Sequence, residues 1–269
     1  MISNRSLLLF SLFGTWIVLV SGCGPKKHFA RVKIPERPKI SRKKEAAKPD
    51  YRDLAKRLIQ NGYYEIALNI LERLSSSHPR DPEVFYLIGL CQSRLHKYEK
   101  AEKSFLRVLS LNKDCARAYN QLGLLYDLQK RHEQATKMYE RAISLNPARA
   151  EFYNNLGYNF LILKKITKAR ECFLKAIAID PDYKKAINNL AFCYVLMGDK
   201  KKAFLLLKKL YSTPVVYYNL AVLYEATGNL EEAYRLYRKS FDMDPHLKNA
   251  DHLALLEEKM IKTLKGRKK

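Results

Sequence analysis

The strongest constraint on the fold is a pattern that recurs every 34 residues between positions 83 and 203. Each repeat places a small residue, an alanine and a large aliphatic residue at three fixed positions. The series are Gly89, Gly123, Gly157 and Ala191; Ala101, Ala135, Ala169 and Ala203; and Ile88, Leu122, Leu156 and Leu190. Apolar residues between them recur at spacings of three and four, which predicts amphipathic helices. One such unit cannot bury its apolar face alone, so the pattern predicts an all-α stack of helix pairs.

The cleanest repeat resembles the signature of the tetratricopeptide repeat family. The residues that carry the resemblance are Tyr153, Leu156, Gly157, Ala169, Phe173, Ala176 and Pro181. The resemblance implies a right-handed α-solenoid of about six repeats over residues 49–247, with the first helix of each unit lining a concave surface. It also implies a protein that binds other proteins and is not an enzyme. Gly or Ala at the helix crossing is expected to allow the two backbones to approach closely.

The period is interrupted once, before the sixth repeat. Ala191 and Ala221 occupy the same position of successive repeats but are 30 residues apart. The four missing residues fall near residues 211–214, which predicts a short second helix or a tight turn in the fifth repeat. Residues 248–264 have an amphipathic pattern that predicts the terminal capping helix such arrays need, and residues 265–269 form a basic tail.

Residues 1–22 are expected to be a lipoprotein signal peptide. Arg5 precedes an uncharged, largely apolar run at residues 7–20, which is too short for a comfortable membrane span. The run LVSGC at residues 19–23 resembles the bacterial lipobox, which implies acylation (palmitate) of Cys23 and stable membrane attachment. A plain signal peptide or an uncleaved anchor helix are the alternatives. By the same resemblance, Gly24 in place of Asp favours the periplasmic face of the outer membrane.

A basic segment separates Cys23 from the repeats. Residues 24–48 hold ten Lys or Arg residues against two acidic ones, with three prolines and no apolar period. This composition is typical of a disordered, self-repelling spacer, and contact with anionic headgroups or cell-wall polymer is the alternative. The whole chain carries a net charge of +23, but export through a signal sequence argues against a nucleic-acid partner.

Asparagine recurs at two adjacent positions of the first helices. An amide side chain both donates and accepts hydrogen bonds, so a row of amides at repeat spacing can bind the backbone of an extended peptide. The alternative is that these amides bond neighbouring helices and stabilise the stack. Together with an apolar stripe just after the small residues, the candidate peptide groove comprises Asn120, Asn154, Asn155, Tyr158, Asn188, Asn189, Phe192 and Asn219.

No catalytic, cofactor or metal motif is apparent in the sequence. A phosphate-binding glycine loop, a zinc-protease motif and a nucleophile elbow are all missing, and the six histidines lack metal spacing. The four cysteines after Cys23 are expected to be small buried hydrophobes, with Cys172 and Cys193 as the one pair whose helices might meet.

A lipobox, a linker and about six repeats resemble two families of pilus-assembly lipoproteins. These are the tight-adherence pilus assembly family TadD and the type IV pilus family PilF/PilW, and residues 153–158, 188–191 and 218–221 are more similar to the former. The high lysine content departs from that family. The resemblance implies a scaffold for pilus or secretin assembly, with a secretin or another pilus component as partner. The alternative is a general envelope adaptor that recruits peptidoglycan hydrolases or proteases.

Overall fold

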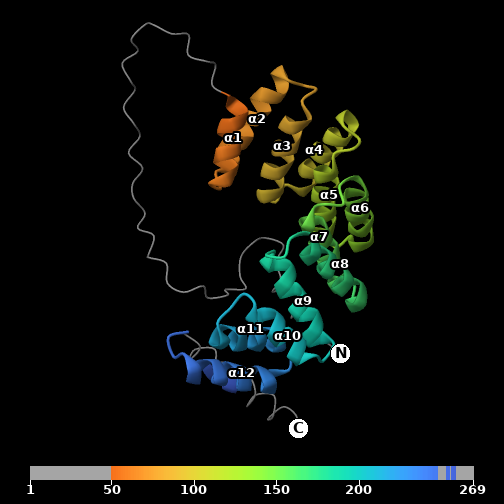
Figure 1. Ribbon diagram of the computed structural model, residues 1–269. Coiled ribbons are helices and arrows are strands. Elements are labelled where there is room, and N and C mark those ends of the chain that lie inside the picture. The colour runs from red at the N-terminus through yellow and green to blue at the C-terminus, as the bar shows by residue number, and fades with distance from the viewer. Residues whose placement is uncertain (1–49, 248–252, 255, 259–269) are drawn as a thin grey trace, which may run out of the picture.

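The computed structural model describes residues 50–247, 253, 254 and 256–258. The expected signal peptide, Cys23, the linker, the basic tail and most of the expected capping helix lie outside the described residues. The described chain forms six antiparallel helix pairs that stack along a curved path (Figure 1). The helices are α1 (Tyr51–Gln60), α2 (Tyr64–Ser77), α3 (Pro82–Arg94), α4 (Tyr98–Leu111), α5 (Ala116–Leu128), α6 (His132–Leu145), α7 (Ala150–Ile162), α8 (Ile166–Ile179), α9 (Lys184–Leu196), α10 (Lys200–Lys208), α11 (Thr213–Ala226) and α12 (Leu230–Met243).

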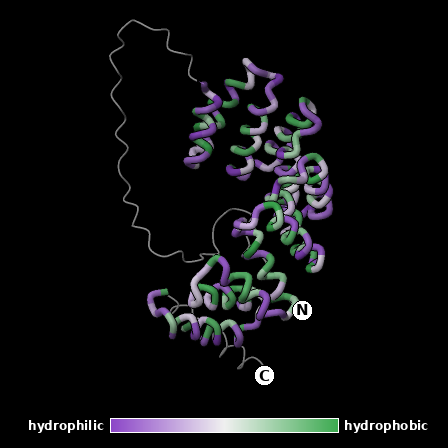
Figure 2. Tube along the Cα trace, viewed as in Figure 1, coloured by the Kyte–Doolittle hydropathy of each residue, from purple (hydrophilic) through white to green (hydrophobic). Residues whose placement is uncertain are grey.

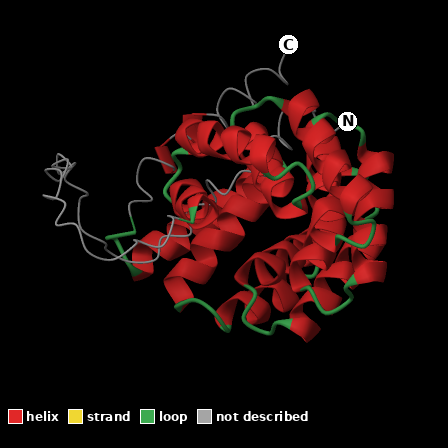
Figure 3. Ribbon diagram, turned by 90° about the horizontal axis from the view of Figure 1, so that it is seen from above, coloured by secondary structure: helices red, strands yellow, loops and turns green. Residues whose placement is uncertain are grey.

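The described residues therefore form the expected all-α solenoid. Seen from above, the pairs follow one another around a curve, and the described chain contains no strand (Figure 3). Apolar residues lie mainly where neighbouring helices face each other, and polar residues cover the outside (Figure 2). Beyond α12, the described positions of the predicted capping helix are helical, and Leu253 and Leu256 are buried against the last repeats.

The small residue of each repeat sits where its two helices cross. A methyl group added to Gly157 of α7 would lie 2.6 Å from the ring of Phe173 in α8, and one on Gly123 would lie 2.5 Å from the ring of Tyr139. These distances are shorter than van der Waals contact, so the aromatic ring occupies the space that glycine leaves. The glycine makes room for an aromatic ring of the second helix, whereas the expected close approach of the two backbones stays a prediction.

The turn within each repeat contains one residue in the left-handed region of φ. In three repeats it is glycine, which adopts this conformation without steric cost. In three successive repeats it is instead His96 (φ 58°), Lys130 (φ 62°) and Lys164 (φ 59°). A side chain at such a position strains the backbone by about 1 kcal/mol.

The fifth repeat has the predicted short second helix. α10 has 9 residues, whereas α8 has 14. Pro214 occupies the first turn of α11, where its missing N–H costs no hydrogen bond, and Ser240 of α12 donates to its carbonyl oxygen at 2.8 Å. The chain thus reaches the last pair through a shorter path than in the other repeats.

Candidate peptide-binding surface

The asparagines of α5, α7 and α9 form a continuous chain of hydrogen bonds across these three first helices. Asn155 Nδ2 donates to Asn120 Oδ1 at 2.9 Å, and Asn189 Nδ2 donates to Asn154 Oδ1 at 3.0 Å. Within α7, Asn154 Nδ2 lies 3.5 Å from Asn155 Oδ1, which completes the path. We call these four residues the amide spine. Its hydrogen bonds join neighbouring first helices, as expected if the asparagines stabilise the stack.

Burial divides the eight candidate groove residues into two sets. Asn120, Asn154, Asn219 and Phe192 are buried, so none of them presents a surface to a peptide. Asn120 and Asn154 face the next first helix, whose asparagines donate to them. The partly exposed set comprises Asn155, Tyr158, Asn188 and Asn189. A peptide on this face would contact the second set, with the first set beneath it.

The spine stops at the shortened fifth repeat. By its place in the repeat, Asn188 of α9 corresponds to Asn154, and Asn219 of α11 corresponds to Asn189. Asn188 Nδ2 instead donates to the hydroxyl of Tyr211 at 3.2 Å, and Tyr211 belongs to the short connection between α10 and α11. Asn219 is 2% exposed, and neither polar atom of its side chain has a hydrogen-bond partner in the described chain.

A second polar cluster, around Asp127, was not identified from the sequence. Asp127 of α5 is 4% exposed and accepts hydrogen bonds from His132 Nδ1 at 2.9 Å, Asn159 Nδ2 at 2.7 Å and the Tyr139 hydroxyl at 3.0 Å. Burial raises the pKa of the Asp127 carboxyl, and the three donors oppose this shift. The donors come from α6 and α7, so the cluster joins three helices. One signal was available in the sequence, because four of the other five repeats have leucine or cysteine at the position of Asn159, and the first has Arg57.

Tyr158 lies beside the amide spine on α7. Burial, and secondarily the negative charge of Asp127, raises the pKa of the Tyr158 hydroxyl above its usual range. The hydroxyl therefore stays protonated and keeps its capacity to donate. Its ring supplies apolar area one helical turn from the partly exposed amide of Asn155, a combination suited to an extended polypeptide.

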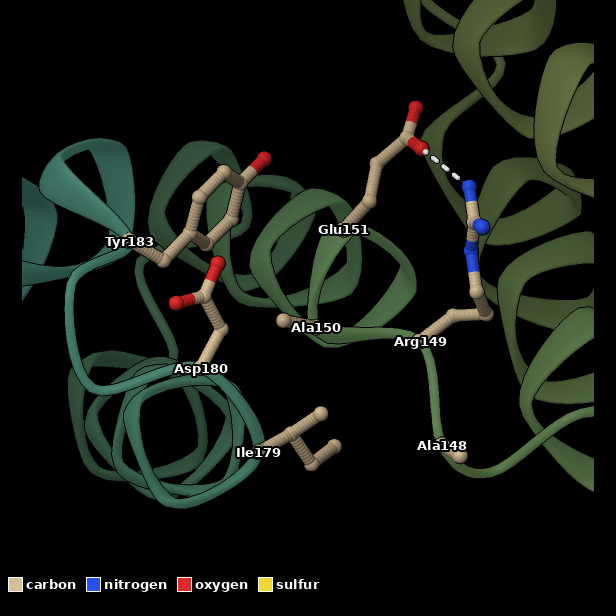
Figure 4. A pocket seen from close by; sticks show the side chains of 7 residues that line it. All are labelled: Ala148, Arg149, Ala150, Glu151, Ile179, Asp180 and Tyr183. Atoms are coloured by element: carbon tan, nitrogen blue, oxygen red, sulfur yellow. Dashed lines mark ion pairs between the residues drawn. The ribbon is translucent and has the colours of Figure 1, made fainter.

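A shallow pocket of about 370 Å³ lies at the N-terminal ends of α7 and α9, between the turns that precede these helices (Figure 4). Arg149 and Glu151 form an ion pair at 3.5 Å on one side of the pocket, and Tyr183 lines the other side (Figure 4). Burial raises the pKa of Tyr183 to about 12, and the charges of Glu151 and Asp180 add to the shift. No lining residue is a buried polar group without a partner, so the pocket does not single out a ligand.

The cysteines of the repeats are free thiols. Cys91, Cys172 and Cys193 are buried, and Cys115 is partly exposed. Burial raises the pKa of Cys91 and Cys193 to about 12 and that of Cys172 to about 11, which keeps these thiols in the unreactive protonated form. The described residues contain no group of His, Cys, Asp and Glu side chains placed to hold a metal ion. None of the described helices has the length and apolar character needed to cross a bilayer.

Stacked helix pairs with a partly exposed row of amide and aromatic side chains define a helical-repeat scaffold, the class that binds other proteins. Comparisons with known proteins agree. The family model of the tetratricopeptide repeat protein 21 C-terminal ARM domain matches residues 85–190, and the tetratricopeptide repeat model matches residues 214–247. The chain is a tetratricopeptide-repeat protein.

Solved structures of several repeat proteins share the fold. PilW, described as a widely conserved type IV pilus biogenesis factor, is 19% identical, with a TM-score of 0.63 over 76% of this chain and 96% of its own. PilF of Pseudomonas aeruginosa is 19% identical, with a TM-score of 0.59 over 72% of this chain and 90% of PilF. MamA of Desulfovibrio magneticus RS-1 is 28% identical, with a TM-score of 0.52 over 59% of this chain and 90% of MamA. No curated protein sequence matches this chain significantly.

Proposed function

We propose that this chain is a lipid-anchored scaffold that assists the assembly of an envelope machine, a pilus or its secretin, and has no catalytic activity of its own. Cys23 is the acylated residue, the basic linker spaces the repeats from the outer membrane, and an extended segment of a partner protein binds the concave face. The lipobox-like sequence and the fold shared with PilW support this assignment.

The observation that carries the binding proposal is the partly exposed row Asn155, Tyr158, Asn188 and Asn189 on α7 and α9. In the amide spine, Asn155 and Asn189 each donate one amide hydrogen to a buried neighbour. An amide side chain has capacity for up to four hydrogen bonds, so both retain groups for a peptide backbone. The buried partners fix the orientation of these amides before the peptide arrives, which reduces the entropy lost on binding.

The experiment is photo-cross-linking in cells at Tyr158. A benzoylphenylalanine at this position replaces one aromatic ring with a larger one and keeps the amide spine intact. The matched control carries the same residue at Tyr63, which is 54% exposed and lies in the turn before α2. Capture of a secretin or another pilus component at Tyr158 alone is the expected result.

Two other results would change the assignment. Capture of peptidoglycan hydrolases or proteases without any pilus component would replace pilus assembly with the general adaptor function. Equal capture at Tyr158 and Tyr63 would show that the concave face is not the binding surface.

The anchor has a separate test. Cys23→Ser is expected to abolish incorporation of labelled palmitate and to move the protein out of the membrane fraction. Retention of both label and membrane association in this variant would contradict acylation at Cys23.

A further inference from the structure

The edge of the solenoid that carries the turns within repeats has an uneven charge. The second residue of the second helix is glutamate in four repeats, and such an acid is favourable because a helix N-terminus carries partial positive charge. In the fourth and fifth repeats this position holds Thr167 of α8 and Lys201 of α10. The full series is Glu65, Glu99, Glu133, Thr167, Lys201 and Glu231.

Lysines gather around these two helix starts. Lys164, Lys165 and Lys168 surround the start of α8, which has no acidic residue in its first turn. The first turn of α10 is Lys200, Lys201 and Lys202. Of these six lysines, Lys200 is partly exposed and the other five are exposed.

The two helix starts lie on the same edge of the stack. Each begins the second helix of its repeat, and α8 and α10 belong to successive repeats that both pack against α9. The lysines of both helices therefore belong to one surface.

Acidic neighbours neutralise part of this edge. Arg131 before α6 pairs with Glu102 of α4 at 3.3 Å, Lys200 pairs with Glu232 of α12, and Lys202 pairs with Asp199 at 2.8 Å. One repeat after Glu102, the corresponding residue is Thr136, so Lys165 lacks the equivalent acid. Within the described part of the chain, none of the lysines 164, 165, 168 and 201 takes part in an ion pair. These four lysines are called the basic edge below.

We propose that the basic edge rests on anionic lipid headgroups. Its cations are lysines, whose compact charges on flexible stems suit a fluid surface of phosphates better than the fixed geometry of a protein carboxylate. Residues 24–48 carry the same sign of charge, with ten basic and two acidic residues, and lie between the expected lipid anchor and the repeats. The inference rests on that anchor, which brings the edge to a bilayer surface where clustered lysines bind anionic lipid.

The test uses the full-length acylated chain in two kinds of vesicle. One kind is phosphatidylcholine alone, and the other is equal parts of phosphatidylcholine and phosphatidylglycerol. Floated vesicles are treated with an amine-labelling reagent, and each lysine is quantified by mass spectrometry. Labelling of Lys164, Lys165, Lys168 and Lys201 is expected to fall several-fold in the anionic vesicles, and labelling of the exposed Lys103 and Lys137 is expected to stay constant.

A paired variant separates charge from folding. Thr167→Glu with Lys201→Glu restores the residue type of the other four repeats, so its melting temperature is expected to equal or exceed that of the wild type. The protection of Lys164, Lys165 and Lys168 is expected to disappear. The control, Lys103→Gln with Lys137→Glu, changes the net charge equally and is expected to keep the protection.

Three outcomes would overturn the proposal. Equal labelling in both kinds of vesicle would show that the edge does not contact lipid. Protection by soluble poly-L-glutamate, but not by anionic vesicles, would assign the edge to an acidic polypeptide. Failure of the chain to float with either vesicle would contradict the anchor itself, whereas equal labelling on floated chain leaves the anchor standing.

Discussion

The crossing of α7 and α8 offers a quantitative test of how the repeats pack. Gly157→Ala places a methyl group 2.6 Å from the Phe173 ring, well inside contact distance. Overpacking of this kind costs about 1–3 kcal/mol, and the better helix propensity of alanine returns about 1 kcal/mol. The variant is therefore expected to be destabilised by roughly 0–2 kcal/mol relative to the wild type.

The chain itself indicates the compensating change. Where the small residue is alanine in the first and fifth repeats, the residue 16 positions later is leucine, as in the buried pairs Ala55 with Leu71 and Ala191 with Leu207. Phe173→Leu alone removes apolar contacts opposite Gly157 and is expected to cost about 1–2 kcal/mol. The double variant fills that space with the alanine methyl, so it is expected to be more stable than the sum of the single changes predicts, by about 1–3 kcal/mol.

The assay is urea unfolding of all four proteins, followed by helical circular dichroism. Repeat arrays need not unfold in two states, so midpoints and slopes are compared together. Additive effects of the two substitutions would refute the packing argument. Such additivity would mean that the Phe173 ring can move away from the crossing. The sixth repeat has this combination, because buried Ala221 there coexists with buried Tyr237.

Four further outcomes are expected. Lys164→Gly relieves a left-handed backbone and should stabilise the protein by about 0.5–1 kcal/mol in the same unfolding assay, whereas Lys164→Ala should not. Asn155→Ala leaves the buried Asn120 Oδ1 without its donor and should cost about 1–3 kcal/mol; an unchanged midpoint would contradict the amide spine. Asn219→Leu removes a buried amide that has no hydrogen-bond partner among the described residues and should raise the midpoint, and a lowered midpoint would show that the amide is satisfied in solution. Burial raises the pKa of the native Asp127 carboxyl above that of the unfolded chain. The wild type should therefore lose stability relative to Asp127→Asn as the pH rises from about 4 through the raised pKa. A difference in unfolding free energy between the two proteins that stays constant with pH would contradict the raised pKa.

Features that repeat were predictable from the sequence. The periodic Gly and Ala positions fixed the helix pairs and the crossing at Gly157, and the single 30-residue step located the short α10. These predictions succeed because each repeat has the same packing geometry, so the same residue types recur at equivalent positions of the sequence.

The orientation of the amides was not predictable. An asparagine at repeat spacing can face a peptide or the next helix, and the sequence contains no signal for which. The structure places Asn120 and Asn154 in the contact between helices and leaves Asn155 and Asn189 partly exposed. Alanine at Asn155 and Asn189 would therefore strip hydrogen bonds from the buried amides of Asn120 and Asn154, and would weaken the fold along with the groove.

The Asp127 cluster was missed for a related reason. Asp127 and Asn159 occur once each at positions where most repeats have apolar residues. A pattern argument averages over repeats and so discards such exceptions. Only the placement of His132, Tyr139 and Asn159 around one carboxylate shows that the exceptions belong together.

The end of the amide spine at α9 has a mechanical consequence. Hydrogen bonds run from α5 to α9 without interruption, but between α9 and α11 Asn219 makes none, and α10 and α11 share the smallest contact of any successive helices in the described stack. A solenoid behaves as a spring whose stiffness is set at each joint. Under a pull along the stack, the solenoid is therefore expected to bend first at the joint before α11, while the hydrogen-bonded helices from α5 to α9 keep their curvature.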